Sequence, residues 1–348
     1  MFSKPSGISC TGNTPFSAER DPNAGSMEGF GENMVIEGLS QEVTEVLTSC
    51  RRSGTLSHYK SAWEKWNGWY IGRKINPISA GVNHVLQFLS DLYQSGLEYR
   101  TINCYRSTIS AYHIHVDNKP IGQHPMVCKL LSGVFNKRPP QPKYTIIWDV
   151  NSVVNYIKRL SSNDELSVKD LTLKLTTLIA LTSSGRSSEI TYLDTRYRVF
   201  KNNSVIFHFS KLTKTWKKGQ SPPTFELNSF TGEDKLCVIQ CLKRYLVVSK
   251  QWRKNPGSDQ LLLSHIKPHG PVTVSTVSRW LKQFLGESGI DTSIFTGHST
   301  RSASSSKVKQ LGLSISQILD RGQWSNKTTF EKFYNKPIMV DNRPSVFG

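Results

Sequence analysis

Apolar side chains recur at helical spacing through the first half of the chain. One such helix face is built from four aromatic residues at positions i, i+4, i+7 and i+11, namely Tyr59, Trp63, Trp66 and Tyr70. The same periodicity predicts three further helices, which begin at a Ser79 cap, near Glu98 and near Pro125. Four short helices in so short a stretch predict a small all-helical domain.

The second half of the chain combines helices with a pair of strands. Residues 204–209 and 223–227 have strand-like composition, and the segment between them is rich in lysine, which predicts a β-hairpin with a long basic tip. Apolar patterns predict helices near residues 151–160, 171–183, 236–249 and 274–286. The fold class expected from these elements is mainly α with a small β-hairpin or sheet, an α+β fold.

Two stretches interrupt this pattern. Residues 1–35 are rich in Gly, Ser, Pro and Asn without apolar periodicity, which predicts disorder, and a short helix is expected over residues 35–50. Residues 138–148 contain three prolines and predict a stiff linker. We therefore expect a disordered acidic leader (1–50), a helical domain (51–137), a Pro-rich linker (138–148), a second domain (149–340) and a tail (341–348).

Charge is distributed unevenly along the chain. Lys and Arg together number 44 against 26 Asp and Glu, a formal net charge of +18. Residues 1–50 hold two basic and seven acidic residues, so the remaining chain carries a net charge of +23. A body this basic predicts a polyanionic partner, and nucleic acid is the first candidate. A soluble basic protein without such a partner is the alternative.

The sequence does not indicate a disulfide-bonded or zinc-binding protein, a nucleotide hydrolase or a membrane protein. The six cysteines form no C-x-x-C pair, so we expect reduced thiols, a reducing compartment and no metal site. No G-x-x-x-x-G-K-[ST] motif predicts nucleotide hydrolysis, and we expect no cofactor. No apolar run is as long as a membrane span and no signal-peptide core begins the chain, so a soluble intracellular protein with no membrane partner is expected.

The last fifth of the chain carries the residues with the clearest chemistry. His298 and Arg301 lie three apart in the run GHSTR, which places both side chains on one face of a helix. We expect Ser299 or Thr300 to cap this helix, so that the pair lies near an N-terminus where an anion such as phosphate is favoured. Further along, Trp324 and Tyr334 are separated by ten positions.

These residues resemble the C-terminal signature of the tyrosine recombinases, or phage integrase family. In that family an H-x-x-R is followed by His or Trp and, ten residues later, by a nucleophilic Tyr. H-x-x-R alone occurs by chance in many chains, whereas the joint match of His298, Arg301, Trp324 and Tyr334 is informative. The sequence GHSTRSASSSK is most similar to the corresponding motif in recombinases of DIRS-type retrotransposons. This resemblance implies that the protein originates from a mobile element and, in a eukaryote, that it is located in the nucleus.

The family's other motifs lie upstream in the expected order. Arg186 falls where the family has its first catalytic Arg, and Glu189 lies one helical turn further on, where it can orient that Arg. The resemblance implies a catalytic Lys at the hairpin tip, where Lys214 fits best because Thr215 follows it. Lys211, Lys217 and Lys218 compete for this role or hold DNA backbone. The first domain resembles the SAM-like core-binding domain that precedes the catalytic domain in this family.

The resemblance implies a site-specific recombinase or integrase that forms a covalent 3′-phosphotyrosine, without metal or ATP. Arg186 and Arg301 would grip the phosphate, His298 would act as base and Lys214 as acid. Trp324 replaces the His of most bacterial members; it can donate one hydrogen bond but cannot shuttle a proton. Basic residues expected to hold DNA phosphates, each of which is alternatively a solvated surface residue, are Arg100, Arg106, Lys137, Lys211, Lys217, Lys218 and Lys307.

The family also implies partners and alternatives. Its members act as tetramers on two double-stranded DNA segments, so self-association is expected. The main alternative is a domesticated DNA-binding protein that keeps the fold without cutting. A type IB topoisomerase would use the same chemistry, but the small helical first domain favours a recombinase.

Overall fold

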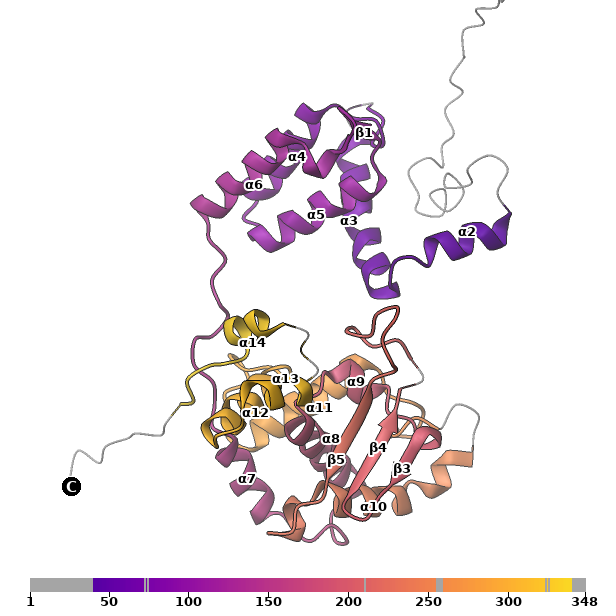
Figure 1. The fold of residues 1–348 in the computed structure, drawn as a ribbon, viewed down its shortest axis with the longest axis vertical. Coiled ribbons are helices and arrows are strands. Elements are labelled where there is room, and N and C mark those ends of the chain that lie inside the picture. The colour runs from indigo at the N-terminus through magenta and orange to yellow at the C-terminus, as the bar shows by residue number, and fades with distance from the viewer. Residues whose placement is uncertain are drawn as a thin grey trace, which may run out of the picture. The chain divides into compact units, whose positions relative to one another are not determined.

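The computed structural model describes residues 40–71, 73, 75–209, 211–254, 259–322, 324 and 326–339. The chain forms two compact units, residues 1–141 and 142–348, which are described separately (Figure 1). The boundary between them falls inside the predicted linker. The leader up to residue 39 and the predicted tail lie outside the described residues.

The first unit is helical, as the periodicity predicted. Its helices are α2 (Gln41–Thr48), α3 (Ser53–Ile71), α4 (Val82–Gln94), α5 (Tyr99–Tyr112) and α6 (Pro125–Lys137). The aromatic face of α3 supplies the core, since Trp63, Trp66 and Tyr70 are almost completely buried. The Trp66 ring packs edge-on against Phe88 of α4, with ring centroids 4.8 Å apart.

Two details of this unit differ from the sequence prediction. Helix α4 is not capped by Ser79, because residues 77–79 form a turn and the helix starts only after Gly81, its N-cap residue. A short antiparallel hairpin, β1 (His115–Val116) and β2 (Lys119–Pro120), follows α5 and was not predicted. Its turn places Asp117 and Asn118 at φ of 49° and 57°, a left-handed conformation that short polar residues tolerate.

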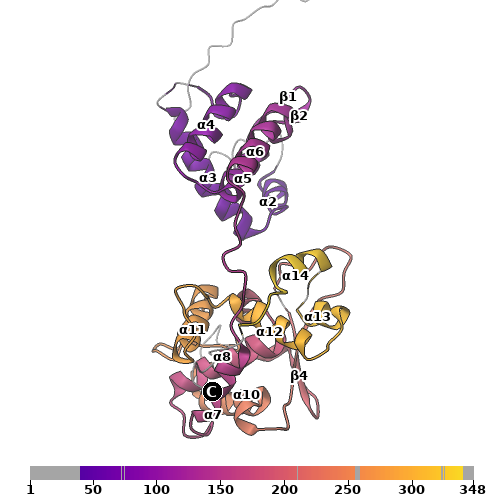
Figure 2. The same cartoon turned by 90° about the vertical axis from the view of Figure 1, so that its left-hand side faces the viewer.

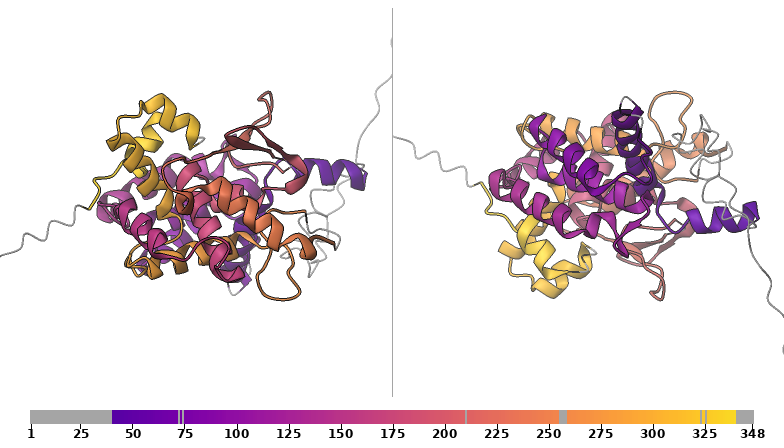
Figure 3. Two further views of the ribbon diagram at one scale, coloured as in Figure 1. Left: turned by 90° about the horizontal axis from the view of Figure 1, so that it is seen from below. Right: turned by 90° about the horizontal axis from the view of Figure 1, so that it is seen from above.

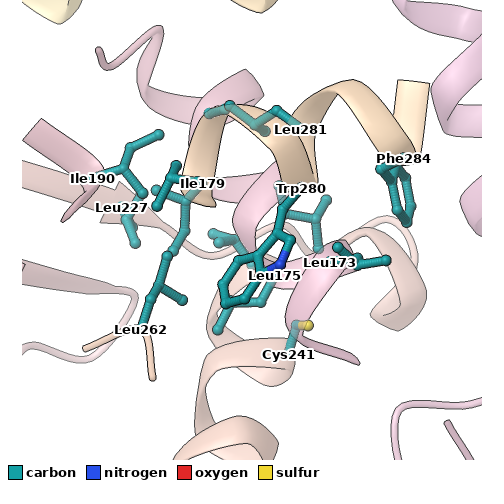
Figure 4. Packing of buried hydrophobic residues seen from close by; sticks show 14 of the residues in the cluster. Leu173, Leu175, Ile179, Ile190, Leu227, Cys241, Leu262, Trp280, Leu281 and Phe284 are labelled. Carbon is teal, nitrogen blue, oxygen red and sulfur yellow. The ribbon is translucent and has the colours of Figure 1, made fainter. Parts of the chain in front are cut away.

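The second unit is organised around α8 (Val168–Ser183), an apolar helix buried on nearly all sides. Around it lie α7 (Val150–Arg159), α9 (Ser187–Thr191), α10 (Val238–Val248), α11 (Val274–Glu287) and α12 (Ser299–Gln310). Leu175 and Ile179 of α8 pack into one core with Cys241 of α10 and with Trp280 and Leu281 of α11 (Figure 4). The buried polar side chains of this helix are hydrogen-bonded, for example Thr176 to the Thr172 carbonyl at 2.7 Å and Lys174 to Asn163 at 2.8 Å, so the helix can occupy such a central place.

A three-stranded antiparallel sheet lies on this core. It contains the predicted hairpin, β4 (Ser204–His208) and β5 (Thr224–Asn228), and an additional edge strand, β3 (Arg198–Phe200), that was not predicted. Val205 pairs with Leu227 and Phe207 with Phe225, and all four side chains are buried. This register fixes where the lysine-rich loop between β4 and β5 begins and ends.

The last described helices are α13 (Ile315–Arg321) and α14 (Lys327–Phe333), which form a small lobe (Figure 3). This lobe has a hydrophobic cluster of its own, made of Ile318, Trp324 and Phe330. Helix α12 lies between α8 and α13 (Figure 2). After α14 the chain returns to the start of the unit. There the Ile147 N–H donates to the Pro337 carbonyl at 2.9 Å, and the Met339 N–H donates to the Ile147 carbonyl at 2.7 Å.

Ile147 and Trp148, which the sequence places in the linker, are therefore part of the second unit. Both side chains are buried in its core. The predicted linker extends past the point where the chain meets residues 337–339, a contact that local sequence does not reveal. Within the described residues, no helix combines the length and apolar character that crossing a membrane requires.

Candidate active site

Arg186 is held at the end of α8 by a turn and a carboxylate. Ser184 ends α8 in a left-handed conformation, and a Cβ at Gly185 would lie 2.7 Å from the Phe225 ring, so the turn fits only glycine. Arg186 then becomes the N-cap residue of α9. The buried Glu189 accepts a hydrogen bond from the Arg186 N–H at 2.7 Å and another from its guanidinium. The carboxylate thus fixes the direction of the Arg186 side chain.

Arg301 lies in the first turn of α12 and is completely buried. Its Nη2 donates to the carbonyl of Gly322 at 3.0 Å, and Nη1 lies 3.7 Å from Glu189. Glu189 therefore contacts both arginines. Burial first, and then the charge of Arg186, lowers the pKa of Arg301 to about 10, which leaves it charged at neutral pH.

Two nitrogens of Arg301, Nε and Nη1, have no hydrogen-bond partner among the described residues. Leaving buried charged donors unsatisfied costs on the order of 1–3 kcal/mol or more. An anionic ligand with several acceptor oxygens removes this cost, and a phosphate group has that character. These two nitrogens of Arg301 are thus suited to bind a phosphate group, the ligand expected from the sequence.

His298 immediately precedes α12 and takes the N-cap position in place of Ser299 or Thr300. The prediction of a hydroxyl cap was wrong, because both hydroxyls point back and donate to carbonyls of the preceding turn. The Ser299 hydroxyl donates to Thr296 at 2.7 Å and the Thr300 hydroxyl donates to Gly297 at 2.8 Å. His298 and Arg301 nevertheless lie in the same helical turn, as their spacing predicted.

Tyr334 follows α14, and its hydroxyl lies 3.4 Å from Nε2 of His298. The pKa of His298 is lowered to about 4 by desolvation and by the charges of Arg301, Arg186 and Lys214. A neutral imidazole beside a phenol can accept the phenolic proton.

Trp324 covers Arg301 on the side of α13 and α14. The guanidinium carbon lies 4.5 Å from the centre of the indole, and the Tyr334 ring packs 5.0 Å from it. The indole Nε1 is buried without a partner among the described residues. A Cβ on Gly322 would lie 1.7 Å from the Trp324 ring, so this residue must be glycine for the indole to reach the arginine. Sequence reasoning missed Gly322; the only signal was a glycine two positions before Trp324.

The lysine-rich loop after β4 lies beside this group. Thr215, the neighbour of Lys214, lines the same pocket as Trp324, with a volume of about 290 Å³. Lys214 itself is exposed, and its charge contributes to the lowered pKa of His298. Lys211 instead lies 5.6 Å from the centre of the Tyr192 ring. Of these two lysines, Lys214 is the one whose charge reaches the site.

Some of the residues expected to hold DNA also make contacts within the protein. The Arg106 guanidinium donates to Asn103 at 2.9 Å and to the Gly122 carbonyl at 3.2 Å, and Lys307 lies 3.5 Å from Asp149. The side chains of Arg100, Lys137, Lys211, Lys217 and Lys218 are exposed. Within the described residues, no three His, Cys, Asp or Glu side chains gather as they would around a metal ion.

Comparison with known proteins identifies the family. Residues 152–339 match the phage integrase family model, which covers α7 to α14 and the whole group of site residues. This chain belongs to the phage integrase family. No curated protein sequence matches it significantly.

Solved structures of recombinases share the fold. The XerH site-specific recombinase in a post-cleavage complex with its palindromic difH substrate is 15% identical, with a TM-score of 0.54 over 78% of this chain and 74% of that chain. The Tn1549 transposon integrase in complex with transposon right-end DNA is 17% identical, with a TM-score of 0.54 over 79% of this chain and 88% of that chain. At such low identity the likeness establishes the shared fold alone.

Proposed function

We propose that this phage integrase family member is a site-specific DNA recombinase in which Tyr334 attacks a phosphodiester and becomes covalently attached to the 3′ phosphate. One observation carries this proposal: the unsatisfied donors of the buried Arg301 lie beside a tyrosine whose hydroxyl is 3.4 Å from His298. A ligand with acceptor oxygens would take up the missing hydrogen bonds of Arg301, and the Tyr334 hydroxyl would then lie beside that ligand as the nucleophile.

The two arginines supply the electrostatic part of the reaction. Attack on a phosphodiester adds negative charge to the non-bridging oxygens, and guanidinium groups donate paired hydrogen bonds to such oxygens. Among the described residues, Nε and Nη1 of Arg301 donate no hydrogen bond, although Nη1 lies 3.7 Å from Glu189, and Arg186 is oriented by the same carboxylate. Donors fixed before the reaction stabilise the transition state without reorganisation.

Proton transfer is assigned to His298 and Lys214. A phenol has a pKa near ~10 and must lose its proton to attack, and the neutral His298 accepts that proton. The bond from the Tyr334 oxygen to phosphorus forms as the bond to the 5′ oxygen breaks, and Lys214 gives that oxygen a proton. A 5′-hydroxyl of another strand then reverses these steps and releases Tyr334.

The partners follow from this reaction. Double-stranded DNA is the substrate, and strand exchange requires several copies of the chain on two DNA segments, for which we propose a tetramer. The helical first unit, with Arg100 and Lys137 exposed, is assigned to DNA binding as a SAM-like core-binding domain. An origin in a DIRS-type mobile element, and a nuclear location in a eukaryote, remain part of this proposal on the strength of the GHSTR spelling.

A trapping experiment tests the proposal without knowledge of the target site. The full-length chain is incubated with a pool of nicked duplexes whose sequence is random around the nick, and covalent adducts are isolated under denaturing conditions. We expect adducts linked to Tyr334 and none with Tyr334→Phe, which should bind the pool as the parent does. DNA binding without any adduct would instead support the catalytically silent alternative.

A further inference from the structure

Helix α12 is buried although its sequence, STRSASSSKVKQ, is almost entirely polar. Its first eight residues are all buried, and Ala303 is the only apolar one among them. Burying a hydroxyl without a partner is costly. The helix is therefore stable only because its hydroxyl groups are hydrogen-bonded. The partners of these hydroxyls show which segments the helix holds in place.

Most of these partners belong to other segments of the second unit. Ser299 accepts a hydrogen bond from the indole N–H of Trp148 at 2.8 Å, and Ser304 bonds to the carbonyl of Leu181 in α8. Ser305 behaves as serines in helices ordinarily do and donates to the carbonyl of Arg301 four residues earlier. Among the described residues, its hydroxyl is hydrogen-bonded only within α12.

Ser302 and Ser306 face the segment that carries Tyr334. Both hydroxyls donate to the Tyr334 carbonyl, Ser302 at 2.8 Å and Ser306 at 3.0 Å. The Lys336 N–H then donates to the Ser306 hydroxyl at 3.0 Å. Since the two serines lie one helical turn apart, they form a single hydroxyl face that holds the chain on both sides of Asn335.

We propose that Ser302 and Ser306 are positioning residues for the nucleophile, a hydroxyl clamp that fixes the backbone of Tyr334 to the helix carrying Arg301. This inference rests on the proposed function of Tyr334. Helix α14 is only seven residues long, and it packs on a small apolar cluster. Such packing alone does little to fix the position of the helix end, where Tyr334 lies. Ser302 is the direct neighbour of Arg301, so the clamp ties nucleophile and phosphate-binding arginine into one rigid body.

The first test measures cleavage. In the full-length chain, the double variant Ser302→Ala and Ser306→Ala should form the Tyr334 adduct roughly 10- to 100-fold more slowly, because a displacement of about 1 Å has an effect of that size. Its affinity for DNA should not change. The matched control is Ser305→Ala, which removes an equally buried hydroxyl from the same helix and should cleave at the parent rate. Parental cleavage by the double variant overturns the proposal.

The second test does not depend on catalysis. Hydrogen–deuterium exchange is resolved to the Lys336 amide, which should exchange faster in Ser306→Ala and at the parent rate in Ser302→Ala, because only Ser306 accepts from that amide. These single variants keep the test decisive if the double variant does not fold. Slower cleavage with parental exchange at Lys336 in Ser306→Ala would overturn the clamp.

The two tests separate this inference from the function on which it rests. If the parent chain forms no adduct, the proposed function fails, and the exchange measurement still decides whether the clamp exists. If the parent forms the adduct and the clamp variants match it in both measurements, the function stands and the clamp fails.

Discussion

The hydroxyl of Tyr334 lies 3.4 Å from Nε2 of His298, although 36 residues separate the two in sequence. Desolvation, and then the positive charges of Arg301, Arg186 and Lys214, lower the pKa of the imidazole. It is therefore neutral near pH 7, the state in which it accepts a proton from the phenol.

The lowered pKa of His298 makes stability depend on pH in a defined window. The pKa falls from 6.5 to about 4 on folding, so between these values the unfolded chain binds more protons than the folded one. His298 therefore destabilises the fold as pH falls from 6.5 towards 4, and contributes no pH dependence above 6.5. As the pH falls between these values, we expect His298→Gln to lose less stability than the parent. The thermal unfolding midpoint of both proteins, measured across this pH range, tests the prediction, and identical profiles of midpoint against pH would contradict it.

Trp324 is expected to stabilise the small C-terminal lobe and to shield Arg301. Trp324→Ala should lower the free energy of unfolding by about 3 kcal/mol, the usual scale for removing a buried aromatic ring, and should slow adduct formation. Trp324→His, which keeps a ring and an N–H donor, should retain activity. Trp324→Phe keeps an aromatic ring but loses the N–H and part of the packing, so Trp324→His, which keeps an N–H, is needed beside it to show whether that donor reaches the phosphate. Urea denaturation and single-turnover cleavage measure the two effects, and an Ala variant equal to the parent in both would refute this role.

Gly322 is expected to tolerate no side chain. A methyl group there would overlap the Trp324 ring, so Gly322→Ala must displace either the indole or the carbonyl that accepts from Arg301. We expect Gly322→Ala to slow adduct formation while DNA affinity is retained. The control is Gly312→Ala, since Gly312 has open space around its Cβ position, although its positive φ of 91° predicts a general loss of stability. A Gly322→Ala variant that cleaves at the parent rate would show that the Trp324–Arg301 contact is dispensable.

Lys214 is expected to be the general acid. Protonation of the leaving 5′ oxygen contributes about 10²–10⁴-fold, so Lys214→Ala should cleave ordinary DNA slowly by that factor. On a substrate with sulfur as the bridging 5′ atom, the leaving thiolate needs no proton and the defect should largely disappear. An Arg186→Ala defect should persist on the same substrate, because the arginine acts on the non-bridging oxygens.

The neighbouring lysines provide the controls for this assignment. Lys211→Ala, Lys217→Ala and Lys218→Ala should weaken DNA binding without selective rescue by sulfur. Rescue of one of these variants would move the role to that lysine. Absence of rescue in all four would place the source of the proton elsewhere, in His298 or in water.

Local sequence predicted the elements of this fold well, and motif spacing predicted which residues would meet. The aromatic face of α3 and the hairpin of β4 and β5 follow from periodicity, which reflects burial directly. Arg186 and Glu189 were expected to pair because they lie one helical turn apart, and the structure has that contact. The ion pair between Glu189 and Arg301 joins segments that are distant in sequence, so the spacing of residues within a motif could not predict it.

What the sequence did not reveal depends on contacts between distant segments. The hydroxyls at the start of α12 suggested a cap, whereas the hydroxyls of this helix form hydrogen bonds inside a buried helix. Gly322 carries no motif, and its requirement appears only when the Trp324 ring is placed against it. Ile147 and Trp148 were assigned to the linker because the pairing of Ile147 with residues 337–339 is invisible to any local pattern.

The hydrogen bonds between Ile147 and residues 337–339 also hold the last described residues of the second unit against one of its first buried residues. This contact lies only a few residues beyond Tyr334. Early and late residues of the unit are therefore neighbours in space, although nearly the whole folded unit separates them in sequence.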